Sequence, residues 1–242
     1  MPEVKPRVTL INHTPEPERL VATAARLCYS PDDIAAIHNH FRGLTKLMEP
    51  APADHMRDPA KMVRQITNLG HLSPLEHTTF TFGIEGVSRS LLAQITRHRI
   101  ASFSVQSQRY VEYGGELEYI VPPDIADNPE HAAAYHNLMA TLKDTYDGML
   151  ASGIEAEDAR FVLPNAAATR MVVTMNAREL LHFFSLRCCN RAQWEIRAVA
   201  WSMLEAVRAV APTIFKDAGP GCVRGQCSEG KMSCGRPYHA KD

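Results

Sequence analysis

The chain has 242 residues, of which 45% are apolar and 22% charged, and its 26 lysines and arginines oppose 27 aspartates and glutamates. This near-neutral balance excludes a basic coat over the whole surface for nucleic acid or anionic membrane, so any anion site must be local. No apolar run reaches the roughly 18 residues of a membrane span, and the segment MPEVKPRVTLINHTPEPERL lacks the apolar core of a signal peptide. We therefore expect a cytoplasmic protein with no membrane and no nucleic-acid partner.

Hydrophobic periodicity predicts helices and strands in alternation. It predicts a strand at residues 7–11, an amphipathic helix at 16–28, a half-buried strand at 79–84, a helix capped by Ser88 that runs into Arg97 and His98, a strand at 117–121, a helix at 130–150 and two helices between 177 and 210. Helices outnumber strands, which favours the α+β class in a single domain over residues 1–218. Residues 219–242 hold five of the thirteen glycines and three of the six cysteines, and we expect an irregular Gly/Cys-rich tail there.

The most informative segment is residues 86–111, which contains no acidic residue but carries four arginines, His98 and several serines. Arginine forks and serine hydroxyls bind phosphate oxygens, so the segment has the composition of an anion receptor. The alternative is that Arg97-His98-Arg99 ends a solvated helix, where cations offset the negative end of the helix dipole. The four arginines together favour a site, but composition does not identify the ligand.

A second basic cluster lies at residues 176–191. Arg178 and His182 share one helical face there, and Arg187 and Arg191 follow at the same spacing of four. Arginines among leucines and phenylalanines are costly to bury unless an anion meets them. Arginines that extend along the edge of an apolar helix into water explain the pattern equally well.

The segment GHLSPLEH at residues 70–77 carries a weaker signal. His71 with Glu76 has the chemistry of an acid/base pair, and His71 with His77 that of metal ligands. The spacing matches no zinc motif, however, and a structural turn at Ser73 explains the segment equally well, so we expect no metal.

The cysteines and the glycine motifs limit the chemistry further. Six unevenly placed cysteines are too few for a secreted disulfide framework, and the tail's Cys222, Cys227 and Cys234 form no CxxC pair, so we expect reduced thiols without zinc or an iron–sulfur cluster. Cys188 beside Arg187 is a candidate thiolate nucleophile, but inside an apolar helix such a thiol is more often an inert core residue. Neither a G-x-G-x-x-G loop nor a P-loop occurs, so a nucleotide cofactor must be bound without a Rossmann motif.

Arg97-His98-Arg99, followed after seven residues by Ser107, fits the R-H-R-x7-S signature of the flavin-dependent thymidylate synthases. The chain resembles this family from the helix near Arg26 through HLSPLEHTTFTF, QITRHRIASFSVQSQRY, ARFVLPNAAATR and MNARELLHFFSLRCCNRAQWEIR, in the family's order, as far as residue 215. A chance match over so many blocks in the same order is not credible.

The resemblance implies the family's own α+β fold, with a mixed sheet flanked by helices, and a homotetramer that binds FAD across subunit interfaces. It implies the reductive methylation of dUMP to dTMP, a methyltransferase reaction with an internal flavin hydride transfer. The one-carbon unit comes from 5,10-methylenetetrahydrofolate, which leaves as tetrahydrofolate, and NADPH supplies the reducing electrons through the flavin.

Carried over by position, the resemblance assigns cofactor contacts to His71, Ser73, Arg97, His98, Arg99, Val105, Asn176, Ala177, Arg178 and His182. It assigns dUMP contacts to Gln94, Ile95, Thr96, Arg97, Val105, Gln106, Ser107, Gln108, Arg109, Arg160 and Arg187, with the 105–109 loop reaching a neighbouring subunit. His71 is expected at the flavin ring and the mouth of the folate site. Arg187 is the expected catalytic residue, because a permanent cation stabilises negative charge that develops on the pyrimidine. Ser107 is assigned to dUMP orientation, since no adjacent base activates it.

The chain departs from the family pattern at three positions: Val105 stands where some members have Glu, His182 where some have Asn, and Arg191 where some have His. These departures concern loop contacts and flavin affinity rather than the reaction class.

Two rival interpretations use the same residues. One is a non-catalytic nucleotide- or RNA-binding module, although only Phe103 and Tyr110 in the arginine–serine segment can stack on bases. The other is a transferase with Cys188 as its nucleophile.

Overall fold

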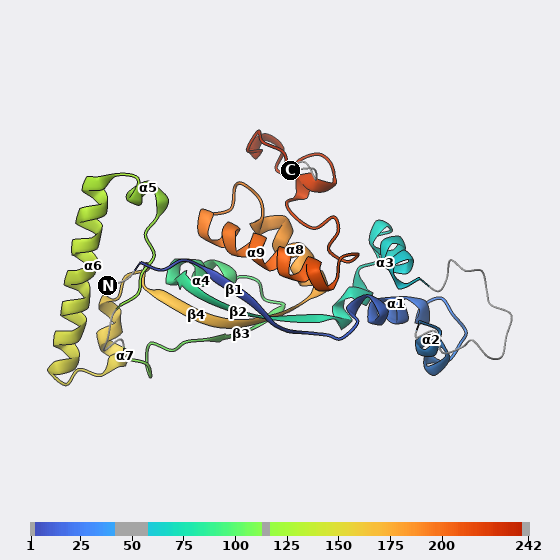
Figure 1. Cartoon of the computed structure of the whole chain (residues 1–242), viewed down its shortest axis with the longest axis horizontal. Helices are drawn as coiled ribbons and strands as arrows, with labels where there is room; N and C mark the ends of the chain where they lie inside the picture. Colours follow the sequence, from blue (N-terminus) through green and yellow to red (C-terminus); the bar gives the residue numbers. More distant parts are fainter. Residues whose placement is uncertain (1–2, 42–57, 113–116, 239–242) are drawn as a thin grey trace. The chain divides into compact units, whose positions relative to one another are not determined.

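A computed structural model describes residues 3–41, 58–112 and 117–238 of the chain (Figure 1). The chain divides into two compact units. Unit 1 comprises residues 1–8, 83–99 and 103–173, and unit 2 comprises residues 9–82, 100–102 and 174–242. None of the helices in the described ranges is both long enough and apolar enough to cross a membrane.

Four strands form a sheet in the order β1-β2-β4-β3. They are β1 (Arg7–His13), β2 (Thr79–Ser88), β3 (Ala101–Val105) and β4 (Ala168–Asn176). The N–H of Thr14, just after β1, donates to the carbonyl of Thr79 at the start of β2 at 3.0 Å, and the N–H of Ala177, just after β4, donates to Thr78 at 2.9 Å. Strand ends that meet strand starts in this way make these neighbours antiparallel.

The expected mixed sheet is therefore corrected to an antiparallel one. Parallel pairing among the described residues is confined to an isolated bridge between Glu3 and Tyr119. The predicted strand at 117–121 is reduced to bridges at Tyr119, which also pairs antiparallel with Ala167. Pro122 and Pro123 follow directly and offer no N–H to extend the pairing.

Unit 2 contains α1 (Pro17–Leu27), α2 (Ile34–Phe41), α3 (Pro59–Asn68), the 3-10 helix η2 (Ser73–His77), α8 (Ala177–Arg187) and α9 (Trp194–Val210), besides two 3-10 turns in the tail. Its aromatic core joins β2 to α8 and to the segment after α9. The ring centroids of Phe80 and Phe215 lie 5.4 Å apart, and those of Phe184 and Phe215 lie 6.0 Å apart. Burying each such ring contributes about 1.5–3 kcal/mol to stability, so this core holds α8 against β2.

Unit 1 contains α4 (Arg89–Ile95), α5 (Pro123–Ala126), α6 (Pro129–Ala151), α7 (Ala156–Ala159) and the 3-10 helix η3 (Arg160–Val162). Figure 1 shows α6 as the long helix of this unit, with α5 and α7 near its two ends. Tyr119, Val121 and Met139 form a small apolar core between α6 and the segment that precedes α5.

The remaining predicted elements are confirmed, with shifted ends. Ser88 caps α4, since its hydroxyl accepts the Leu91 N–H at 3.0 Å. The helix stops at Ile95, however, so Arg97 and His98 follow it instead of lying on it. The strands β3 and β4 escaped prediction. β3 lies inside the arginine–serine segment, whose polar composition resembles that of a loop, and its side chains alternate between half-buried and exposed.

The tail is irregular, as expected, with only the 3-10 turns η4 (Gly221–Arg224) and η5 (Gly230–Met232) over residues 219–238. It is nevertheless tied to the body of unit 2. Tyr238 packs on Trp201 of α9, and just before the tail the guanidinium of Arg208 on α9 donates to the carbonyls of Phe215 and Ala218. Residues 239–242 lie outside the described part of the chain.

Candidate functional site

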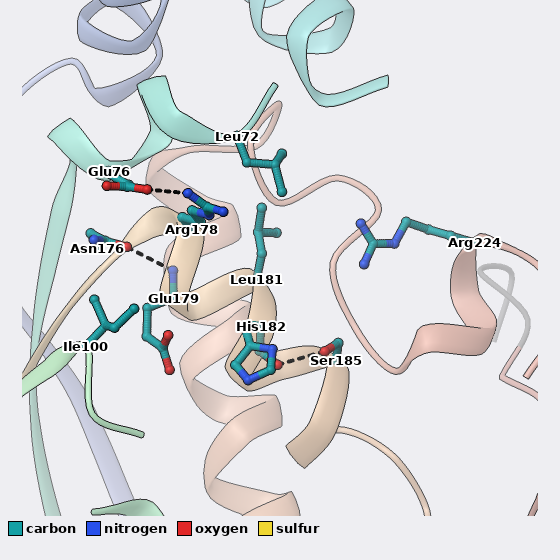
Figure 2. Close-up of a pocket in the computed structure, with 10 residues that line it drawn as sticks. All are labelled: Leu72, Glu76, Ile100, Asn176, Arg178, Glu179, Leu181, His182, Ser185 and Arg224. Carbon is teal, nitrogen blue, oxygen red and sulfur yellow. Dashed lines mark hydrogen bonds and ion pairs between the residues drawn. The ribbon is translucent and has the colours of Figure 1, made fainter. Parts of the chain in front are cut away.

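A cavity of about 600 Å³ lies in unit 2 along α8 (Figure 2), and we call it the α8 cavity. Apolar side chains from three segments and polar groups from α8 share its wall. The lining residues are Leu72, Glu76, Ile100, Asn176, Arg178, Glu179, Leu181, His182, Ser185 and Arg224. This volume is within the range of small-molecule and cofactor sites, as is the combination of apolar wall and few polar groups.

The first turn of α8 sets the polar side of this cavity. Asn176 is the N-cap residue, and its side-chain oxygen accepts the Glu179 N–H at 2.8 Å. Arg178 lies in the first turn of α8. Its guanidinium donates to Glu76 of η2, with 2.5 Å between Nη1 and Oε1. One turn further along, the Ser185 hydroxyl donates to the His182 carbonyl at 2.7 Å.

A second cavity of about 400 Å³, also in unit 2, is the His71 cavity. Its lining residues are Ala25, Cys28, Tyr29, Ile66, Gly70, His71, Leu72, Ser73, Pro74 and Arg178. The ring of His71 stacks on Tyr29 at 6.4 Å between centroids, and its Nδ1 lies 3.0 Å from the Tyr29 hydroxyl. The considered pair of His71 with Glu76 is not formed, because His71 bonds to Tyr29 and Glu76 to Arg178.

The two cavities share Leu72 and Arg178. The predicted cofactor residues of two distant segments therefore line these two adjoining cavities. They are His71, Ser73, Asn176, Arg178 and His182. A sixth, Ala177, is fully buried and lines neither cavity; its N–H bonds to Thr78 and fixes the start of α8.

Arg187 lies at the other end of α8, in its last turn, and lines neither of these cavities. It is half-buried, and this burial lowers the pKa of its guanidinium from the ordinary value. A guanidinium stays protonated at neutral pH even so. The negative end of the α8 dipole favours a cation at this position.

The other predicted residues lie in unit 1. After α4 ends, Arg97 and Arg99 are exposed, whereas His98 between them is 5% exposed. Ile95 is fully buried, and the Thr96 hydroxyl donates to the Leu92 carbonyl at 2.8 Å. Gln94 likewise bonds to its own helix, through the Ser90 carbonyl at 3.3 Å. Arg97 and Arg99 thus face solvent, as does Thr96, whereas His98 does not.

The 105–109 segment follows β3 and is held by main-chain bonds. The Gln106 N–H donates to Arg170 on β4 and its carbonyl accepts from Arg89, each at 3.0 Å. Val105 and Gln106 line a third cavity, of about 430 Å³, over β2, β3 and β4. The Ser107 hydroxyl accepts the Arg109 N–H at 3.1 Å.

The structure brings Arg109 and Arg160 together at Glu157. Nε and Nη2 of Arg109 lie 2.8 and 2.7 Å from one carboxylate oxygen of Glu157, and Nε of Arg160 donates to its carbonyl at 3.0 Å. In the same unit, Nε2 of Gln108 and Nε of Arg89 are buried without a hydrogen-bond partner in the described ranges. Buried donors of this kind are costly unless a ligand or water meets them, so they mark a place for an acceptor.

Sequence reasoning did not single out Tyr29, Glu157 or Arg224. No spacing or composition signal links Tyr29 to His71 or Glu157 to Arg109, because these contacts depend on the tertiary fold. Within residues 3–41, 58–112 and 117–238, no three metal-ligating side chains gather around one point.

The Cys188 thiol is almost fully buried, and burial raises its pKa to about 12 despite the nearby Arg208. Such a thiol is protonated at neutral pH and is a poor nucleophile. The structure therefore disfavours the interpretation that makes Cys188 the nucleophile.

Comparison with known proteins identifies the family of the chain. The family model of the thymidylate synthase complementing proteins matches residues 9–213. The chain is 50% identical over 236 residues to a flavin-dependent thymidylate synthase of Geobacter sulfurreducens, covering 97% of this chain and 96% of the relative. It is 44% identical over 251 residues to a protein of the same name from Clostridium tetani, covering 97% and 95%. Because both alignments cover 97% of this chain, they extend past residue 213, where the family model ends, and into the tail.

Among solved structures, the UMP/dUMP methylase PolB of Streptomyces cacaoi, determined with 5-Br dUMP, is similar with a TM-score of 0.73 at 23% identity, covering 88% of this chain and 94% of that one. This likeness confirms the α+β fold. The matched family region and the relatives at 50% and 44% identity show that the chain belongs to the flavin-dependent thymidylate synthase family.

Proposed function

We propose that this protein is an FAD-dependent thymidylate synthase. The reaction consumes dUMP, 5,10-methylenetetrahydrofolate, NADPH and a proton, and yields dTMP, tetrahydrofolate and NADP⁺. The one-carbon unit reaches C5 of the pyrimidine at the oxidation level of a methylene, and the two electrons that reduce it to a methyl group come from NADPH. We further propose a cytoplasmic homotetramer whose sites are shared between subunits.

The observation that carries the proposal is the convergence of His71, Ser73 and the α8 segment on two cavities with a common wall. These are the segments that the family resemblance assigns to the cofactor. The apolar side chains of Leu72, Ile100 and Leu181 suit an aromatic ring system, and Arg178 suits phosphate oxygens.

A bound flavin supplies hydride transfer. The residues of this chain bind it and orient it. In the proposal Arg178, His182 and Asn176 hold it in the α8 cavity, and His71 stands where the flavin ring meets the folate. Arg97, His98, Arg99 and Val105 are proposed as further contacts to the cofactor. The stack of His71 on Tyr29 keeps the imidazole in one orientation.

The nucleotide is assigned to the exposed arginines and the loop of unit 1. Arg97, Arg109 and Arg160 are proposed for the phosphate, and Gln94, Gln106, Ser107 and Gln108 for orientation. The buried, unpartnered Nε2 of Gln108 supports this role, since a base or phosphate oxygen is the acceptor that it lacks. For Ile95, Thr96 and Val105 we propose contacts through the main chain, because the Ile95 side chain is buried and the Thr96 hydroxyl is already bonded.

Arg187 is the proposed catalytic residue. Its positive charge stabilises negative charge that develops on the pyrimidine when C5 becomes nucleophilic. Partial burial supports this role, because a cation in a medium of low dielectric constant interacts more strongly than one in water.

An absorbance spectrum of the purified protein, followed by anaerobic addition of NADPH with and without dUMP, tests the proposal. We expect flavin bands that bleach faster when dUMP is present, and dTMP once 5,10-methylenetetrahydrofolate is added. A protein that stays colourless after incubation with FAD contradicts the proposal and favours the rival nucleotide- or RNA-binding module.

A further inference from the structure

The C-terminal tail is fastened to unit 2 at several points. Arg208 on α9 binds the carbonyls of Phe215 and Ala218 at 3.2 and 2.7 Å. At the far end, the Tyr238 ring lies 5.0 Å from Trp201 of α9, and the Tyr238 N–H donates to Cys222 Sγ at 3.2 Å. These contacts hold the residues just before the tail, and Tyr238 within it, against the same helix.

Between these points the tail contacts the loop that joins α8 to α9. The Arg191 guanidinium donates to the Met232 carbonyl, and the Asn190 amide donates to the Arg236 carbonyl at 3.4 Å. Gly219 has a φ of +139°, and a Cβ there would lie 3.1 Å from a methyl group of Val223. Glycine at this position thus lets the chain turn tightly into η4, the turn that ends in Arg224.

Arg224 is the tail residue that lines the α8 cavity. Figure 2 shows its side chain reaching from the tail, with the guanidinium turned toward Leu181 and His182 on α8. The other arginine of the cavity, Arg178, is ion-paired with Glu76. In the described part of the chain, by contrast, Arg224 has no ion pair and no side-chain hydrogen bond. It therefore offers a full positive charge and a free fork of donors at the cavity.

We propose that Arg224 binds the phosphate oxygens of FAD in the α8 cavity, so that the tail is a structural part of the cofactor site. This inference rests on the proposed function, which assigns the α8 cavity to the flavin. A guanidinium fork matches the paired oxygens of a phosphate, and the anchored tail holds the main chain of Arg224 beside the cavity before the ligand arrives. Preorganisation of this kind lowers the entropic cost of binding.

The test is a titration of the deflavinated full-length protein with FAD, followed by flavin fluorescence. Arg224→Ala is expected to raise the Kd for FAD about tenfold or more, as the loss of a charge-assisted hydrogen-bonding partner predicts. Arg224→Lys keeps the charge without the fork and is expected to restore part of the affinity. Riboflavin lacks phosphate, so its Kd is expected to be the same in the unaltered and altered proteins.

Arg236→Ala is the matched control, because Arg236 is an exposed arginine of the same tail that lines neither the α8 nor the His71 cavity. It is expected to leave the Kd for FAD unchanged. An unchanged Kd in Arg224→Ala overturns the inference, as does a weaker affinity for riboflavin, which would indicate a distorted cavity. A change in the Kd for NADPH or dUMP alone also overturns it, because the phosphate would then belong to another ligand. Failure of the unaltered protein to bind FAD, in contrast, contradicts the proposed cofactor itself.

Discussion

Arg178 on α8 and Glu76 in η2 form an ion pair with 2.5 Å between Nη1 and Oε1, and Arg178 at the same time lines both the α8 cavity and the His71 cavity. Both side chains are about half exposed. Ion pairs in that environment contribute about 0–1 kcal/mol to stability. The pair therefore orients Arg178 more than it stabilises the fold, and the consequence of losing it belongs to ligand binding.

Arg178→Ala is expected to raise the Kd for FAD about tenfold or more, since a charged hydrogen-bond donor is lost from the wall of both cavities. The free energy of unfolding is expected to change by less than about 1 kcal/mol. Arg64→Ala provides the control, because it removes a similarly exposed ion pair, with Asp58 on α3, that lines neither cavity. Fluorescence titration and urea denaturation measure the two quantities, and equal FAD affinity in the two variants would remove Arg178 from the cofactor site.

Arg187→Ala is expected to leave FAD bound and to lower kcat by about 10²- to 10³-fold, the loss that removal of one preorganised charge contact produces. The reason is that Arg187 lines neither cofactor cavity, whereas its half-buried charge is proposed to act on the pyrimidine. Steady-state rates and flavin absorbance measure the two effects separately. Arg187→Lys is the companion variant and is expected to recover part of kcat. Near-normal turnover in Arg187→Ala would show that the catalytic group lies elsewhere.

Local patterns in the sequence were sufficient for most of the elements. The alternation of Phe80, Phe82 and Ile84 marks β2, and the cap at Ser88 marks the start of α4, because both signals depend only on neighbouring residues. β3 was missed although Ala101, Phe103 and Val105 alternate with serines, because the strand is short and its serines give the segment the composition of a loop. The antiparallel direction of the strands could not be predicted from the sequence either, since pairing between distant segments is set by tertiary packing.

The same distinction applies to the candidate site. The family resemblance assigned Asn176, Arg178 and His182 to the cofactor, and α8 brings them to one cavity. The contacts of Arg109 with Glu157 and of Arg224 with the α8 cavity join residues far apart in the sequence. No periodicity or composition encodes such contacts, so only the folded chain reveals them.

Arg109→Ala is expected to raise KM for dUMP about ten- to a hundredfold with a much smaller effect on kcat, because a phosphate contact of this kind affects substrate binding more than the chemical step. The ion pair of Arg109 with Glu157 is half exposed, so its loss is expected to cost under about 1 kcal/mol of stability. Arg7→Ala is the matched control, since it removes an exposed ion pair with Glu85 in the same unit. If both variants raise KM equally, the effect is one of net charge and not of a contact at Arg109.

Cys188→Ser is expected to retain turnover and a pH–rate profile with unchanged apparent pKa values. The thiol is buried and its pKa is raised to about 12, so a thiolate does not form at the pH of the reaction. Initial rates measured from about pH 6 to about pH 9, the range in which histidines and activated thiols change charge, provide the measurement. Complete loss of activity in a folded Cys188→Ser protein would support the interpretation in which the Cys188 thiol is the nucleophile.

Burial of Cys188 also predicts how stability depends on pH. In the unfolded chain the thiol has its ordinary pKa of 9.0, whereas in the folded chain the pKa is about 12. Between these two values the unfolded chain releases a proton that the folded chain keeps, so the free energy of unfolding falls as pH rises, by up to about 1.4 kcal/mol per pH unit from this group. Below the lower value both states hold the proton, and the group contributes no pH dependence.

Urea denaturation under reducing conditions, at a series of pH values on either side of the ordinary thiol pKa, measures this slope. Cys188→Ala is expected to be less stable than the unaltered chain at neutral pH and to lose less stability as the pH is raised, so the difference between the two narrows. Cys28→Ala, which removes an exposed thiol, is expected to follow the unaltered chain at every pH. A constant difference between the unaltered chain and Cys188→Ala across the alkaline range would mean that the buried thiol ionises in the folded state as readily as in the unfolded one.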